Sequence, residues 1–322
     1  MRVDLTDLES AASSKSDNEE ASFGALGWFS QALVKVINSP SFILYGLVVP
    51  LTLIAWVWLF LAAQGVASSN AGGTLGPSMQ LMEPLLRGMD ISTGNAWIAY
   101  IISICTPSSL DASVTIQSMT TMFLMWLVMA IAMMLPTAAP MLRTYAEIAD
   151  TAARKGEPAV PLVVLTAGYL AVWTGFSLQA TLLQSAVIAA GGALDPSSPV
   201  IGLVGGSILI LAGLYQFSPL KNACLVKCRN PFTIIFAQWS NKPADIFKLG
   251  LQQGLFCLGC CWALMLVMLS VGTMNLVWMA FLTLFTLLEK TGSGVMITRV
   301  FGIVLLAWGL FLVLTSANLT FS

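Results

Sequence analysis

Five of the six cysteines fall in two short clusters whose spacing suits a soft metal ion. Three residues separate Cys224 from Cys228, and Cys257 is followed closely by Cys260 and Cys261. Each spacing brings sulfur atoms within reach of a single ion on a loop or a helix. Because thiolates favour Cu(I) over hard cations, the two clusters predict a thiolate metal site, with copper as the ion. The sixth cysteine, Cys105, stands alone and is interpreted as inert.

Methionines repeat the pattern with thioethers. Met129 and Met133 share one face of a predicted helix with Met134 beside it, and Met265 continues the face of Cys257. Thioether sulfur is also a soft ligand, although methionine often simply fills gaps in a helical core, which is the interpretation that the methionine face alone favours. The predicted metal ligands are Cys224, Cys228, Cys257, Cys260, Cys261, Met133, Met134, Met129, Met265 and Glu289.

The chain contains no histidine. A Ser-His-Asp triad, a His-based zinc or iron site and a His-ligated haem therefore cannot be built from this chain alone. A bound metal must use sulfur, carboxylate or carbonyl ligands, or ligands from a partner protein.

Charged residues at the ends of apolar segments are the other candidates. Glu289 and Lys290 end one such segment, and Lys221 follows another. Glu289 could be a hard metal ligand, a proton acceptor, the salt-bridge partner of Lys221, or simply a charge at the membrane interface.

Composition predicts an all-α, polytopic transmembrane helical bundle. Hydrophobic residues make up 57% of the 322, charged residues 9%, and the mean hydropathy is +0.85, far from a soluble domain. Residues 1–38 read as a disordered cytoplasmic tail without a signal peptide, 39–318 as the membrane domain, and 95–106 as too short to cross. The six or seven predicted spans lie near 41–64, 118–142, 160–190, 199–219, 249–272, 274–289 and 294–316.

Basic residues predict the orientation. With seven spans and a cytoplasmic amino terminus, thirteen of the fourteen Lys and Arg residues fall on the cytoplasmic side, and only Arg87 falls outside. We therefore expect a multi-pass protein of the bacterial inner membrane with the two cysteine clusters near its cytoplasmic face. Thiols on that side are kept reduced, so a set of disulfides is not predicted.

Several segments resemble a known bacterial family. They are the AMMxPxxxPM run within 126–142, the CLxxC motif within 215–231, the CLGCCW motif within 250–265, and the shorter motifs at 272–279 and 288–290. Together, from about 120 to 310, they are similar to a family described as predicted metal-binding integral membrane proteins. The resemblance implies a metal-related role in copper and membrane-oxidation contexts. Any histidine that relatives carry is absent here.

Four functions are compatible with these features. The first is a protein that holds or relays Cu(I) through a Cys/Met site for a membrane cuproenzyme. The second is a subunit of a membrane-bound, metal-dependent oxygenase or oxidoreductase complex, and the third is a thiol-redox protein. The fourth is a purely structural role, in which the cysteines serve as small packing residues. Whether the chain is an enzyme stays open. The expected partners are the lipid bilayer and another protein; nucleic acid is not expected, because topology explains the basic loop 221–248.

Overall fold

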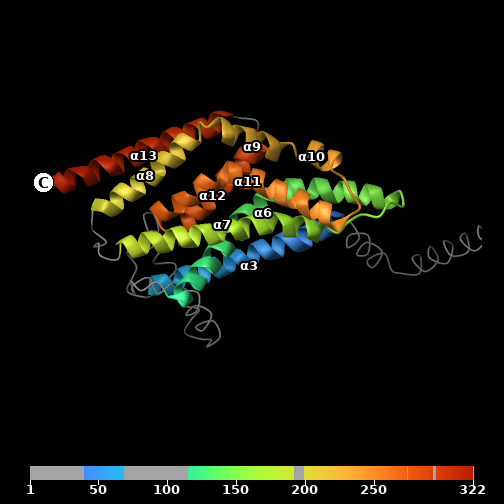
Figure 1. Cartoon of the computed structure of the whole chain (residues 1–322), viewed down its shortest axis with the longest axis horizontal. Helices are drawn as coiled ribbons and strands as arrows, with labels where there is room; N and C mark the ends of the chain where they lie inside the picture. Colours follow the sequence, from blue (N-terminus) through green and yellow to red (C-terminus); the bar gives the residue numbers. More distant parts are fainter. Residues whose placement is uncertain (1–39, 69–114, 192–198, 274, 293–294, 322) are drawn as a thin grey trace, which may run out of the picture.

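The computed structural model describes residues 40–68, 115–191, 199–273, 275–292 and 295–321, and every regular element within them is a helix (Figure 1). The helices are α3 (Pro40–Ser68), α6 (Ile116–Arg154), α7 (Leu162–Gly191), α8 (Pro199–Tyr215), α9 (Pro219–Arg229), α10 (Pro231–Ala237), α11 (Pro243–Val271), α12 (Leu276–Thr291) and α13 (Val295–Phe321). The predicted tail 1–38, the segment 95–106 and Cys105 lie outside the described residues.

The helices form an elongated bundle whose members run mostly along the long axis of the molecule (Figure 1). α8 packs along α13, α11 packs along α7, and α6 lies between α3 and α7. The short helices α9 and α10 gather toward one end, with α9 against α11. The two cysteine clusters, on α9 and α11, are thus brought to neighbouring helices.

Five helices, α3, α6, α7, α11 and α13, are long and apolar enough to cross a membrane. α8 and α9 pass the same test together, but they are bent by 64° at the break between them, which would make a sixth span. α12 has only 16 residues. The predicted helical bundle is confirmed in its all-helical class within the described residues, whereas six or seven complete spans stay a prediction.

Two prolines interrupt the hydrogen bonds of α6, the longest described helix at 39 residues. Pro136 has no N–H, so the carbonyl oxygen of Ala132, one turn earlier, lacks its usual donor. The indole Nε1 of Trp56 in α3 donates to that oxygen at 3.1 Å. A side chain of the neighbouring helix therefore satisfies the group that the proline frees.

Glycines let α7 and α11 approach closely. A Cβ added to Gly250 would lie 2.2 Å from the carbonyl oxygen of Leu165, and one added to Gly168 would lie 2.3 Å from that of Phe247. Small residues at a helix contact permit such packing between apolar helices. This contact fixes the rotation of α11 against α7 and so decides which α7 side chains face the cysteines.

The break between α8 and α9 has a local cause. Pro219 occupies the first turn of α9, where its missing N–H costs nothing. Ser218 caps the helix by accepting a hydrogen bond from the Leu220 N–H at 3.2 Å. The chain therefore turns sharply at 216–218 and directs α9 across α11 and α12.

Candidate metal centre

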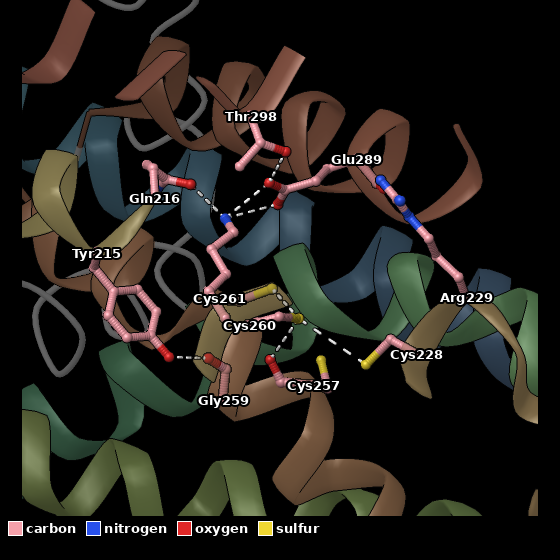
Figure 2. Close-up of polar contacts among 11 residues, drawn as sticks. Tyr215, Gln216, Cys228, Arg229, Cys257, Gly259, Cys260, Cys261, Glu289 and Thr298 are labelled. Atoms are coloured by element: carbon pink, nitrogen blue, oxygen red, sulfur yellow. Dashed lines mark hydrogen bonds and ion pairs between the residues drawn. The ribbon is translucent and has the colours of Figure 1, made fainter. Parts of the chain in front are cut away.

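Cys228 of α9 and the cysteines of α11 converge in the interior (Figure 2). The Sγ atom of Cys260 lies 3.2 Å from that of Cys261 and 4.0 Å from that of Cys228. Cys260 and Cys261 are fully buried, and all five cysteines in the described residues are free thiols. We refer to Cys228, Cys257, Cys260 and Cys261 as the thiol cluster.

Cys224 lies one turn from Cys228 on α9 and faces the same helix. A Cβ added to Gly259 of α11 would lie 2.6 Å from the Cys224 Sγ atom, so the glycine makes room for this thiol. The Tyr215 hydroxyl donates a hydrogen bond to the Gly259 carbonyl oxygen (Figure 2). The glycine therefore lets α9 approach α11, and the tyrosine, at the end of α8, ties α8 to the same point of α11.

Cys257 has polar partners from two other helices. The ammonium of Lys290 in α12 lies 3.1 Å from its Sγ atom, and the Tyr169 hydroxyl of α7 lies 3.0 Å from it. Lys290 also donates to the Thr137 hydroxyl of α6 at 2.6 Å. A buried cation therefore touches the thiol cluster, an arrangement that offsets negative charge on the sulfur.

A cavity of about 290 Å³ opens between these helices. Cys228 and Cys257 contribute their side chains to its wall, together with Lys290, Arg229 and Gln253. Tyr169 and Thr137 also line it. Two of the four residues of the thiol cluster therefore line this cavity.

Glu289 lies in an ion pair and not among the sulfurs. Its carboxylate oxygen Oε1 is 2.8 Å from the Lys221 ammonium, and it accepts a hydrogen bond from the Thr298 hydroxyl at 2.7 Å. Lys221 also donates to Gln216, and the Arg229 guanidinium donates to the backbone oxygen of Glu289 at 2.9 and 2.7 Å (Figure 2). Of the roles that the sequence allowed for Glu289, the structure contains the salt bridge to Lys221.

The predicted methionine ligands belong to the core. Met129, Met133, Met134 and Met265 are at most 1% exposed, and none of them lines the cavity. Met134 approaches the thiol cluster through its backbone, because the Tyr169 hydroxyl bonds both its carbonyl oxygen, at 3.0 Å, and Cys257. The methionine in the cavity wall is Met141, at the end of the same sequence motif.

No three Cys, Asp or Glu side chains are arranged as a ready-made metal site in the part of the chain that the structure describes. Two sulfurs are nevertheless enough to hold one soft ion. Two metal–sulfur bonds of about 2.3 Å span at most ~4.6 Å, and the Cys228 and Cys260 Sγ atoms are 4.0 Å apart. The geometry therefore fits a two-sulfur site and leaves the role of the other predicted ligands a prediction.

Sequence reasoning named Lys290 as a candidate without giving it a role, and it did not single out three other polar residues of this site: Tyr169, Thr137 and Arg229. The signal for Lys290 was present, since it is a charge at the end of an apolar segment and such charges usually face a cavity or a partner. Tyr169 and Thr137 carry no comparable signal. Their place beside Cys257 follows from the rotations of α7 and α6, which spacing along one helix does not reveal.

Comparison with known proteins links the chain to one family. A family model described as PpoB2, copper chaperone, matches residues 123–312, which are 190 of the 322 residues. The matched range contains α7 to α12 and the whole thiol cluster. None of the curated proteins and none of the solved structures compared with the chain matches it.

Proposed function

We propose that this chain, which belongs to the copper chaperone family described as PpoB2, is a membrane protein that holds or relays Cu(I) through sulfur atoms for a membrane cuproenzyme. The family supports a copper-related function. The membrane location is supported by five helices that are long and apolar enough to cross. The cuproenzyme partner is supported by the need of a chaperone for a recipient.

The approach of Cys228 and Cys260 is the observation that carries the proposal. Their sulfur atoms come from different helices and lie 4.0 Å apart. Thiolates are the ligands that Cu(I) prefers over hard donors. Two ligands hold the ion without enclosing it, which suits a protein that must release its cargo.

The neighbouring thiols supply a route for ligand exchange. Cys261 is 3.2 Å from Cys260, and Cys257 lines the cavity. A Cu(I) ion bound by two thiolates has a net charge of minus one, which is costly to bury without a counter-charge. The Lys290 ammonium at 3.1 Å from Cys257 is placed to balance it. In this proposal copper enters at Cys257 or Cys228 and moves between sulfurs.

The orientation is part of the proposal. Thirteen of the fourteen basic residues fall on one side when the amino terminus is cytoplasmic. In this orientation Lys155 between α6 and α7 is cytoplasmic, and the thiol cluster lies nearer that side of the bacterial inner membrane. Reporter fusions after residue 157 and after residue 322 test it: cytoplasmic and external signals, respectively, are expected, and the reverse would refute the orientation.

Elemental analysis of the purified protein tests copper binding. We expect Cu(I), added anaerobically to the reduced protein in detergent, to be retained by the wild type and lost from Cys228→Ser and Cys260→Ser. Cys224→Ser is the comparison on the same helix as Cys228: this two-sulfur proposal does not use Cys224, whose thiol faces Gly259, so the variant should keep its copper. Equal copper in all four proteins, or in none, would overturn the proposal.

A further inference from the structure

Among the residues that the structure describes, the cavity beside the thiol cluster is lined by cationic side chains and by no acidic one. Its wall includes Lys290 and Arg229, and none of its lining residues is Asp or Glu. The carboxylate of Glu289, which is next to Lys290 in sequence, is paired with Lys221, and Glu289 does not line the cavity. A cavity with this charge favours an anionic occupant.

Arg229 has no carboxylate partner in the described part of the chain. Its guanidinium donates twice to the backbone oxygen of Glu289, which is a neutral acceptor. Lys290 differs, since a Cys257 thiolate at 3.1 Å would balance its charge. The positive charge of Arg229 therefore remains available, and a guanidinium is well suited to a carboxylate.

Gln253 supplies a second donor. Its side chain is only 3% exposed, and its Nε2 atom is buried without a hydrogen-bond partner. It lines the same cavity as Arg229 and Lys290. An unsatisfied buried donor costs about 1–3 kcal/mol, and an acceptor oxygen of a ligand in the cavity would remove that cost.

We propose that this cavity binds a small carboxylate, held by Arg229 and Gln253. The volume of about 290 Å³ restricts it to a small molecule. Two sources share this chemistry: a plain carboxylate, and a carboxylate that also bears a thiol. The second would place its sulfur near Cys228 and Cys257, where it could exchange Cu(I) with the protein, and only this version rests on the proposed copper function.

Thermal unfolding of the copper-free protein tests the proposal, because a ligand that binds the folded state raises the melting temperature. The probes are acetate, mercaptoacetate and 2-mercaptoethanol, with an uncharged phosphine as reductant. Each compound is added separately. We expect mercaptoacetate to raise the Tm of the wild type, whether or not acetate also raises it, and we expect 2-mercaptoethanol to leave the Tm unchanged. The shift should disappear in Gln253→Leu and Arg229→Leu.

Two neighbours on the same helices are matched controls. Gln252→Leu removes an amide and Lys227→Leu a positive charge, and neither residue lines the cavity; both should keep the shift. Gln253→Leu removes a donor that has no partner, so it should fold normally even if Arg229→Leu does not.

The outcomes separate the two sources. A shift with both acids indicates a plain carboxylate, and a shift with mercaptoacetate alone indicates a thiol carboxylate. No shift with either acid, an equal shift with 2-mercaptoethanol, or a shift that survives in Gln253→Leu would overturn the proposal. Because copper is absent, this result does not depend on whether copper binds to the thiol cluster.

Discussion

Lys221 of α9 and Glu289 of α12, 68 residues apart in sequence, form an ion pair with both side chains 1% exposed. Gln216 and Thr298 complete the polar surroundings of the pair. A buried pair is costly to break, because removing one partner leaves the other charged and uncompensated. This pair therefore joins α9, which carries Cys228, to α12, which carries Lys290.

Removing one member of the pair should destabilise the protein severely. Lys221→Met or Glu289→Leu alone should cost about 3–5 kcal/mol, because each leaves a buried charge without a partner. The double substitution should recover most of that loss. Thermal unfolding of the detergent-purified variants measures the effect; if the double variant lost as much as the sum of the singles, the pair would not be coupled.

Replacing a glycine by alanine at the α7–α11 contact should destabilise the protein, whereas the same replacement at a glycine outside the contact should not. Gly250→Ala would put a methyl group 2.2 Å from the Leu165 carbonyl oxygen, and overpacking of this kind costs about 1–3 kcal/mol. Gly175→Ala is the control, because nothing lies within 4 Å of its added Cβ. It should be neutral or stabilising by up to ~1 kcal/mol. Equal melting temperatures for the two variants would argue against the close contact.

Trp56 should matter only while Pro136 is present. Trp56→Phe removes the donor to the Ala132 carbonyl oxygen and should cost about 1 kcal/mol. In a Pro136→Ala background, the new backbone N–H satisfies that oxygen, and Trp56→Phe should cost much less. A double-mutant cycle of unfolding free energies measures the difference, and additive effects would show that the tryptophan acts through packing alone.

Mild oxidation should join Cys228 to Cys260. Diamide takes up the two electrons and two protons of the thiols, and a disulfide forms between sulfurs that are now 4.0 Å apart. Mass spectrometry of peptides should find this bond in the wild type and in Cys224→Ser, and Cu(I) bound first should prevent it. A Cys224–Cys228 bond instead would mean that α9 and α11 are not packed as described, and reversible oxidation without copper binding would favour the thiol-redox function.

Hydropathy alone predicted most helix positions. The predicted span 160–190 corresponds to Leu162–Gly191, and 274–289 corresponds to Leu276–Thr291. The predicted span 118–142 lies within α6, which continues to Arg154. After Leu142 the sequence of α6 becomes more polar. The ion pairs of Arg143 with Glu147 and of Arg154 with Asp150, each four residues apart, support the helix in this part.

The site was only partly predictable. The grouping of Cys228 with Cys260 followed from the predicted topology, which puts both near one membrane face. The contact of Lys290 and Tyr169 with Cys257 depends on helix rotation, which the α7–α11 glycines fix.

Adjacent positions on α12 hold two different parts of the bundle. Glu289 is tied to α9 and α13 through Lys221 and Thr298, and Lys290 is tied to α6 and α11 through Thr137 and Cys257. Consecutive helical residues point about 100° apart, so α12 contacts α9 and α13 with one side chain and α6 and α11 with the next. Turning the helix about its axis would break both sets of contacts together. α12 therefore acts as a torsional lock, and any movement that frees Cys257 from Lys290 by turning α12 must also strain the buried ion pair.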